Sequence, residues 1–254
     1  MVKTVSASRC CNRTASFSRF LSDRQRRVPE NNRLAEKWYK RAADQGDDEA
    51  QFELGECYYL GRGVKKDINK AFQYNKKAAK QGHVVAKCCL GQAFSDGEGV
   101  RKNYKKAVQW YLLAASAGDD DAQVSMGFHY FYGLGVPKNV NEAILWYRKA
   151  ARQGRRNAQS NLGLCYKFGD GVKKNRRIAN QWFCKAAEQD HDGAQSNLAD
   201  AYRDGLGIKK AANNGNVDAQ CELVPFPVIE FRVEDSGHNY FQIKDFRQDD
   251  RRYI

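Results

Sequence analysis

Residues 60–67, LGRGVKKD, decide how this chain is interpreted. Two glycines one residue apart, followed by valine and two lysines, resemble a loop that cradles a phosphate, but such a loop occurs once and ends in Lys-Ser or Lys-Thr. Here the stretch returns at a constant spacing of 36 residues, as GEGVRKN from Gly97, GLGVPKN from Gly133, GDGVKKN from Gly169 and GLGIKKA from Gly205. A motif with a fixed period of this size indicates stacked structural repeats.

Two further segments keep the same spacing. The first begins as AQFELGECYYLG at Ala50 and returns as AKCCLGQAFSDG, AQVSMGFHYFYG, AQSNLGLCYKFG and AQSNLADAYRDG. The second begins as WYKRAADQG at Trp38 and returns as YNKKAAKQG, WYLLAASAG, WYRKAARQG and WFCKAAEQD. Together they define four complete units, 47–82, 83–118, 119–154 and 155–190, with a partial unit on either side.

Each unit is predicted to form two helices. In the first, apolar and small residues recur along one helical stripe, as in Ala50, Leu54, Gly55 and Tyr58. The first glycine of the loop is predicted to cap this helix in the left-handed conformation, which glycine adopts without a side-chain clash. The second helix is predicted to begin after an N-cap, which is Asp67, Asn103, Asn139 or Asn175. Its alanines are expected to pack beside the aromatic at the position of Tyr74, Trp110, Trp146 and Trp182. The double-glycine loop is therefore the turn of a helical hairpin, and the predicted fold class is all-α.

The combined pattern resembles a known repeat family. It runs Ala-Gln-x-x-Leu-Gly-x-x-Tyr-x-x-Gly-x-Gly-Val-x-Lys-Asn and then Lys-Ala-x-x-Trp-Tyr-x-Lys-Ala-Ala-x-Gln-Gly, which is similar to the Sel1-like repeats, relatives of the tetratricopeptide repeats. The resemblance covers about residues 28–220. It implies a right-handed α-solenoid of stacked helical hairpins. It also implies a scaffold or adaptor that binds another protein or peptide, with signalling proteins among the candidates, and it names no single partner.

The ends of the chain depart from this pattern. Residues 1–27 form a basic, Ser-rich extension without a recognisable first helix, and residues 221–254 form a tail with two β-rich runs, 228–233 and 240–246. The tail suits a β-hairpin or a disordered end. Residues 1–22 are basic and lack acidic residues, so they suit a mitochondrial transit peptide as well as a basic tail. A cytoplasmic protein is the preferred expectation and a mitochondrial one the alternative.

The chain has 254 residues and a formal net charge of +13, most of it in the repeats. No apolar run is long enough to predict a transmembrane helix. Basic residues at equivalent loop positions predict a charged edge along the stack: Lys65, Lys66, Arg101, Lys102, Lys173, Lys174, Lys209 and Lys210. This edge is either a solvated rim or a surface for anionic membrane or nucleic acid. Because the loops lack stacking aromatics, nucleic acid is the weaker alternative.

No catalytic, metal or cofactor site is expected. The histidines share no metal-ligand spacing: His83, His129, His191 and His238. Asp119, Asp120 and Asp121 stand where a helix begins, a place where the helix dipole favours acidic residues. The eight cysteines show no zinc-site spacing and are expected as reduced thiols. A hydrolase of the kind claimed for disulfide-rich bacterial relatives is therefore the least supported alternative.

The units differ most at two surface positions of the first helix. The position of Glu56 is Gln92, Phe128, Leu164 and Asp200 in later units, and that of Leu60 is Asp96, Tyr132, Phe168 and Asp204. In related solenoids the first helices line a concave groove. We therefore expect an apolar patch with acidic ends to bind the partner, formed by Phe128, Tyr132, Leu164 and Phe168. Packing between repeats explains these four residues equally well.

Overall fold

The computed structural model describes residues 31–203, 229–233 and 239–243, and the chain divides into two units, 1–208 and 209–254. The described helices of the first unit are α2 (Asn32–Asp44), α3 (Asp48–Leu60), α4 (Ile68–Gln81), α5 (Val84–Asp96), α6 (Tyr104–Ser116), α7 (Asp120–Tyr132), α8 (Val140–Arg152), α9 (Arg156–Phe168), α10 (Arg176–Ala187) and α11 (Asp192–Arg203). In the second unit, β1 (Ile229–Val233) and β2 (Asn239–Ile243) pair as antiparallel strands with Phe231 opposite Phe241.

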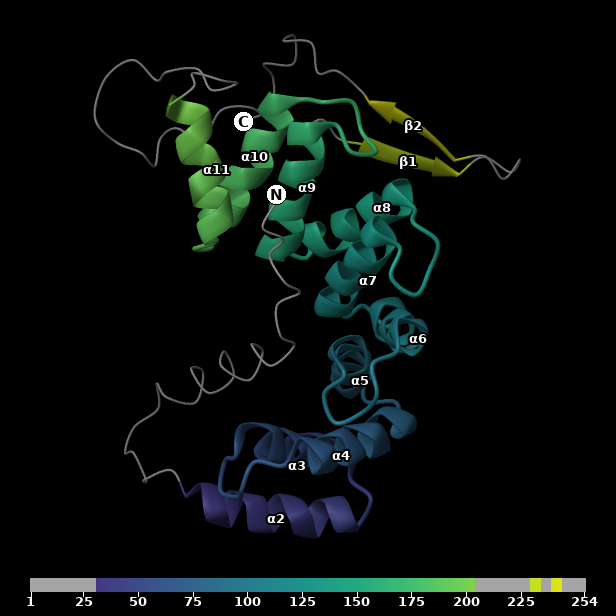
Figure 1. The fold of residues 1–254 in the computed structure, drawn as a ribbon, viewed down its shortest axis with the longest axis vertical. Helices are drawn as coiled ribbons and strands as arrows, with labels where there is room; N and C mark the ends of the chain where they lie inside the picture. The colour runs from purple at the N-terminus through teal and green to yellow at the C-terminus, as the bar shows by residue number, and fades with distance from the viewer. Residues whose placement is uncertain (1–30, 204–228, 234–238, 244–254) are drawn as a thin grey trace, which may run out of the picture. The chain divides into compact units, whose positions relative to one another are not determined.

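The helices form a stack of hairpins. Figure 1 shows α2 to α11 following one another in sequence order. Each helix packs chiefly against the helix before and after it in the chain, and α5 also contacts α7. The closest pairs are the predicted hairpins: α3 with α4, α5 with α6, α7 with α8 and α9 with α10. This arrangement confirms the predicted α-solenoid.

The helix ends lie where the loop chemistry predicts them. Each second helix begins after a side-chain oxygen that accepts a hydrogen bond from a backbone N–H of the first turn, and these caps are Asp67, Asn103, Asn139 and Asn175. The first helices end at left-handed glycines, which are Gly61, Gly97, Gly133 and Gly169. The caps satisfy backbone groups that a helix end otherwise leaves without a partner.

The second glycine of the loop is needed for a different reason. A Cβ added to Gly135 would overlap the backbone carbonyl of Tyr104, at the start of the preceding unit's second helix. The loop therefore docks on the previous hairpin with no room for a side chain. The first glycine of the loop therefore allows the turn, and the second allows neighbouring units to stack closely.

The core contains a column of aromatic rings that face glycines. A Cβ added to the glycine would lie 2.5 Å from the ring in three successive units: Gly91 with Tyr111, Gly127 with Tyr147 and Gly163 with Phe183. The ring of Tyr111 is 1% exposed, whereas Trp38, at the tryptophan position that precedes this ring position, is 58% exposed. The aromatic that faces the glycine is therefore one residue later than the position that the sequence analysis expected to fill the core, although Trp146 at that expected position is also buried.

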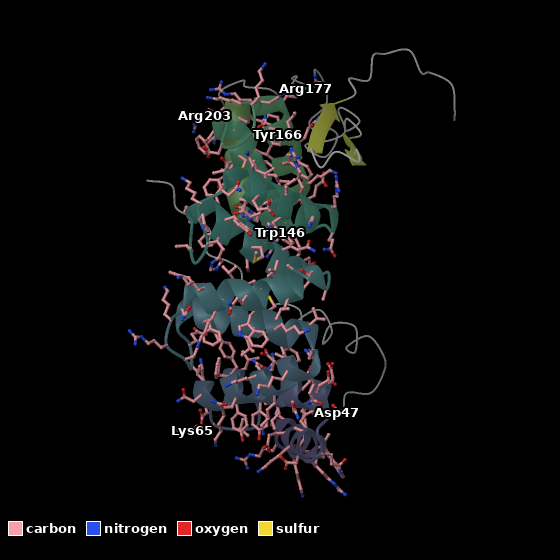
Figure 2. The ribbon with its side chains drawn as sticks, turned by 90° about the vertical axis from the view of Figure 1, so that its right-hand side faces the viewer. Asp47, Lys65, Trp146, Tyr166, Arg177 and Arg203 are labelled. Carbon is pink, nitrogen blue, oxygen red and sulfur yellow. The ribbon has the colours of Figure 1, made fainter. Side chains whose placement is uncertain are left out.

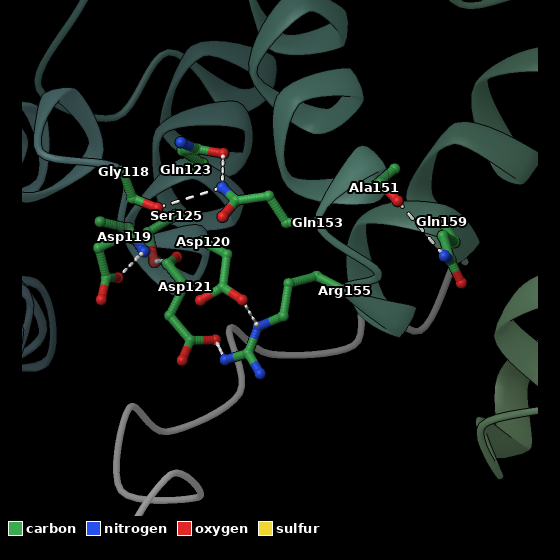
Figure 3. Close-up of polar contacts among 11 residues, drawn as sticks. Gly118, Asp119, Asp120, Asp121, Gln123, Ser125, Ala151, Gln153, Arg155 and Gln159 are labelled. Atoms are coloured by element: carbon green, nitrogen blue, oxygen red, sulfur yellow. Dashed lines mark hydrogen bonds and ion pairs between the residues drawn. The ribbon is translucent and has the colours of Figure 1, made fainter.

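Glutamines join successive units on another side of the stack. Gln153 donates from Nε2 to the Gly118 carbonyl at 3.1 Å and to Gln123 Oε1 at 2.9 Å, as Figure 3 shows. The same side-chain pair recurs within other units, Gln81 with Gln51 and Gln189 with Gln159, and Gln81 also donates to the Gly46 carbonyl of the preceding unit. In the unit 83–118, Lys87 and Ala117 occupy the two glutamine positions, so this pair is absent there. The repeated Ala-Gln and Gln-Gly motifs thus bond one unit to the next.

Candidate functional site: a groove with two hollows

A hollow of about 390 Å³ opens across three successive first helices. It is lined by Glu56 of α3, Gln92 of α5 and Phe128 of α7, which occupy one repeat position. The stacking of units thus brings together side chains that are 36 residues apart in the sequence. A volume of a few hundred Å³ is typical of ligand pockets.

One ring is missing from the aromatic column beside the hollow. Asn75 stands at the position of Tyr111 in the next unit, and it lines the hollow. Its Oδ1 would lie 2.5 Å from a Cβ added to Gly55, so it faces that glycine as the rings face theirs. An amide is much smaller than a phenol ring, and interiors are otherwise closely packed. Space that a ring fills in the other units therefore stays open here.

Acidic and amide groups form part of the wall. Glu56 is 3% exposed and Asn75 is 7% exposed. Among the described residues, Asn75 Oδ1 has no hydrogen-bond partner, a costly state for a buried acceptor. Near the rim, Glu98 accepts a hydrogen bond from the Tyr59 hydroxyl at 2.9 Å. A partly buried wall of this kind favours a ligand that donates hydrogen bonds.

A buried histidine closes the α7 side of the hollow. His129 is 1% exposed, and its Nδ1–H donates to the Leu134 carbonyl at 2.8 Å. The rings of Tyr104 and Tyr111 lie 5.8 and 5.3 Å from the imidazole. Burial lowers the pKa of His129 below its usual value, against the smaller opposing effect of the carbonyl. The imidazole is therefore neutral at pH 7 and adds no cation to the wall.

A smaller hollow of about 170 Å³ lies between α9, α10 and α11. Phe168 and Asp200, at the variable first-helix positions, line it together with Lys174 and Arg176. Lys167 donates to Asn197 Oδ1 at 2.6 Å within the same wall. The two hollows thus differ in charge, the larger one being mainly acidic and the smaller one mainly basic.

The four apolar residues expected at the groove divide between these regions. Phe128 lines the larger hollow, and its ring centroid lies 4.7 Å from that of Tyr132, which is 42% exposed. Phe168 lines the smaller hollow and is 52% exposed. Leu164 is half-buried and packs against the core around Phe183. Phe128 and Phe168 therefore belong to different hollows, and Leu164 has the contacts that packing between repeats would give it.

The predicted basic edge lies on the loops. Its described members are all exposed: Lys65, Lys66, Arg101, Lys102, Lys173 and Lys174. Figure 2 shows Lys65 at one edge of the stack. The Lys102 ammonium lies 4.7 Å from the centroid of the Tyr104 ring, close enough for a cation–π contact. Lys209 and Lys210 fall outside the described residues.

The acidic triplet at the start of α7 joins two units. Asp119 accepts the backbone N–H of Ala122 at 2.8 Å, which caps the helix. Arg155 of the next unit pairs with Asp120 at 3.4 Å and with Asp121 (Figure 3). Within the described ranges, no three His, Cys, Asp or Glu side chains gather as they would to hold a metal ion. The triplet therefore serves stacking.

The cysteines of the described residues form no disulfide: Cys57, Cys88, Cys89, Cys165 and Cys184. Burial raises the pKa of the Cys165 thiol to about 12, so its reactive thiolate is scarcely populated at pH 7. Cys10, Cys11 and Cys221 lie outside the described part of the chain. Of the helices that the structure describes, none combines the length and the apolar character needed to cross a membrane.

A model of the Sel1 repeat family matches most of the chain, at residues 8–47, 48–83, 86–119, 120–154, 156–191 and 193–216. The chain belongs to the Sel1 repeat family. The first Sel1 match begins at residue 8, inside the stretch 1–27 that the sequence analysis set apart as an extension. The structure describes none of residues 8–27.

Solved structures of other Sel1 repeat proteins are similar to this one. A Sel1 repeat protein from Oxalobacter formigenes is 39% identical with a TM-score of 0.66, over 69% of this chain and 71% of that one. The c5321 antigen of uropathogenic Escherichia coli, which displays an SLR fold, is 38% identical with a TM-score of 0.65, over 68% of this chain and 37% of that one. A Sel1-like repeat protein of Schizosaccharomyces pombe is 48% identical over 42 residues, 16% of this chain and 6% of that protein. The chain thus spans a minor part of the length of the last two.

Two residues of the groove were missed by sequence reasoning. Asn75 interrupts the aromatic column, and His129 lies behind it as a buried neutral imidazole. The sequence does carry a signal for Asn75, since YNKKAA replaces the aromatic pair found in WYKRAA, WYLLAA and WYRKAA. The substitution predicts a cavity only once it is known which of the two adjacent aromatic residues faces the glycine.

Proposed function

We propose that this chain is a non-enzymatic scaffold that binds a partner protein or peptide in the groove of its first helices. One observation carries the proposal. The repeat position that varies most in chemistry, occupied by Glu56, Gln92 and Phe128, lines a single hollow. The positions that stay alike between units are used in caps, turns and packing. A constant framework with a variable concave surface is how repeat proteins recognise extended partners.

The family and the chemistry of the remaining groups agree with this proposal. Sel1 repeats share the helical-hairpin architecture of solenoids that bind other proteins. The side chains that could have suggested catalysis are engaged elsewhere: His129 in a carbonyl hydrogen bond, Asp121 in an ion pair and Cys165 in the core. These three side chains therefore have structural roles, and binding a partner requires no catalytic group.

Truncation of two groove residues tests the proposal. The partner is identified by capture on the full chain, and its affinity is then measured with both components purified. We expect Tyr132→Ala to weaken binding about tenfold or more while changing the free energy of unfolding by less than about 1 kcal/mol, since its side chain is 42% exposed. Phe128→Ala should also weaken binding, with a larger loss of stability because its side chain is half-buried.

Leu113→Ala is the matched control, since Leu113 is 53% exposed on the second helix α6. Its affinity for the partner should equal that of the unchanged chain. If Leu113→Ala weakens binding as much as Tyr132→Ala does, the partner binds another face and the groove proposal is wrong. If both groove variants lose much stability, these aromatic side chains pack between repeats and do not form the binding surface.

A further inference from the structure

We propose that the larger hollow is a pocket for an arginine side chain of the partner, so the groove selects partners that present an exposed arginine. The inference rests on the proposed peptide-binding function and adds the chemistry of one subsite. Its starting point is the gap that Asn75 leaves in the aromatic column.

The charge of the wall favours a cation. Glu56, Asp96 and Glu98 line the hollow, and the lysine among its lining residues is Lys102. The Lys102 ammonium lies over the Tyr104 ring, and Lys102 is exposed. Glu56 on α3, by contrast, is only 3% exposed. Three carboxylates against one exposed lysine give the wall an acidic surplus, which attracts a positively charged group into the hollow.

The polar groups of the wall favour a cation with several hydrogen-bond donors. Asn75 Oδ1 is an acceptor with no partner in the described structure, and its residue is more than nine-tenths buried. A guanidinium presents five N–H donors in a planar fork, so it can serve the amide oxygen and a carboxylate together. A quaternary ammonium has no donor and would leave Asn75 Oδ1 unsatisfied. Lysine donates from one point and reaches fewer of these acceptors.

The aromatic residues of the hollow favour a flat group. Tyr59, Tyr104, Tyr111 and Phe72 line the hollow beside Phe128. Arginine stacks its planar guanidinium on aromatic faces and is more weakly hydrated than lysine, so its transfer from water costs less. The hollow of about 390 Å³ spans three successive first helices and the second helices beside them, which suits a side chain delivered by a bound peptide.

A peptide selection on the full chain tests the inference. Random peptides displayed on phage are selected on the unchanged protein and on Asn75→Tyr, which restores the ring found at this position in the other units. We expect the peptides recovered on the unchanged protein to share one arginine and to bind Asn75→Tyr at least about tenfold more weakly. Replacing that arginine by citrulline, which keeps the shape and removes the charge, should weaken binding by a similar factor.

Two further variants keep the test sharp. Glu56→Gln should reduce the preference for arginine over citrulline, whereas Phe168→Ala, in the smaller hollow, should leave it unchanged. A melting curve for Asn75→Tyr at or above that of the unchanged protein shows that the fold is retained. If Asn75→Tyr does not fold, the Glu56→Gln comparison decides.

The outcomes separate this inference from the broader proposal. Peptides that bind both proteins equally and lack a shared arginine overturn the arginine pocket and leave the scaffold function standing. Recovery of no peptide at all counts against both. Free arginine that competes as strongly as the whole peptide would mean that the pocket serves a small molecule, which overturns the assignment to a partner side chain.

Discussion

Single glycines decide how closely the hairpins of this chain approach one another. Gly133 ends α7 with φ of 72°, in the left-handed region. Gly135, two residues later, has no space for a Cβ beside the Tyr104 carbonyl. The first position is constrained by backbone conformation and the second by contact, so substitutions at the two report on different features.

Gly133→Val should lower the free energy of unfolding by about 1–3 kcal/mol, because a β-branched residue is strained at positive φ. Gly133→Asn is the matched control, since asparagine tolerates the left-handed region better. Some loss remains for both, because an added Cβ would lie 3.1 Å from the Cβ of Lys138. Urea unfolding measures the difference. Equal losses for Val and Asn would show that contact with Lys138, and not backbone strain, sets the cost.

Protonation of His129 should make the fold less stable in mild acid. Burial lowers the pKa of His129 in the folded state, whereas the unfolded chain protonates it near its usual pKa of about 6.5. As the pH falls through this value, the unfolded state takes up a proton that the folded state does not, so stability falls. Asp96 raises the pKa and limits the effect.

The check is the pH dependence of the urea unfolding midpoint between about pH 8 and pH 5. His129→Gln should flatten the profile compared with the unchanged chain. Burial also lowers the pKa of His191, so some dependence should persist in that variant. A profile that His129→Gln leaves unaltered would assign the whole dependence to other groups.

At the scale of elements, the joint between neighbouring hairpins combines apolar packing with a repeated polar link. Gln123 donates from Nε2 to the Ala115 carbonyl at 3.3 Å and accepts from Gln153 at 2.9 Å. Each glutamine therefore forms two hydrogen bonds, one with the other glutamine and one with a backbone carbonyl near the end of the preceding unit's second helix. The unit 83–118 carries Lys87 and Ala117 at these positions, so the joint between it and the preceding unit lacks this link and can be strengthened without changing the fold.

Restoring both glutamines should stabilise that joint. Lys87→Gln and Ala117→Gln together are expected to raise the free energy of unfolding by about 1 kcal/mol, the usual net value of a buried hydrogen bond. The double variant should exceed the sum of the single ones, because the hydrogen bond between the two side chains forms only when both are present. Chemical unfolding of the four proteins of the cycle measures this coupling. Strict additivity would show that the two side chains do not meet.

At the scale of the whole molecule, the chain gains stability through a series of neighbouring contacts between units. The buried residues form successive clusters along the stack, and one of them spans α3 to α8 through Phe52, Tyr111 and Trp146. Sulfur is distributed through this series: Cys88 is 0% exposed and Cys165 is 3% exposed. The thiols therefore report on the integrity of the stack.

Thiol counting should find all eight cysteines reactive when the chain is unfolded without reductant. In the native protein, Cys89 should react faster than Cys165, because Cys89 is half-buried and lines the larger hollow whereas burial raises the pKa of Cys165 to about 12. The time course with a thiol-specific chromogenic reagent measures both. Fewer than eight thiols after unfolding would indicate disulfides and a different cellular environment.

Much of the fold could be predicted from the sequence because its signals are local. The double glycine, the Asn caps and the helical stripe each act within a few residues of the backbone, so their repetition at 36 residues identifies the hairpins and their stacking. The same register placed Phe128 and Tyr132 one helical turn apart on α7, and of the two Phe128 lines the larger hollow while Tyr132 is the more exposed.

Only the tertiary structure decided which aromatic enters the core and where space remains. Tyr111 and Trp110 are adjacent and equally apolar in the sequence, but only Tyr111 faces a glycine of the partner helix, so it is the ring that is buried. The consequence of Asn75 depends on that choice, because an amide leaves a cavity only where a ring would have packed. Burial is set by neighbours that are distant in the sequence, and no local pattern specifies the rotation of each helix toward them.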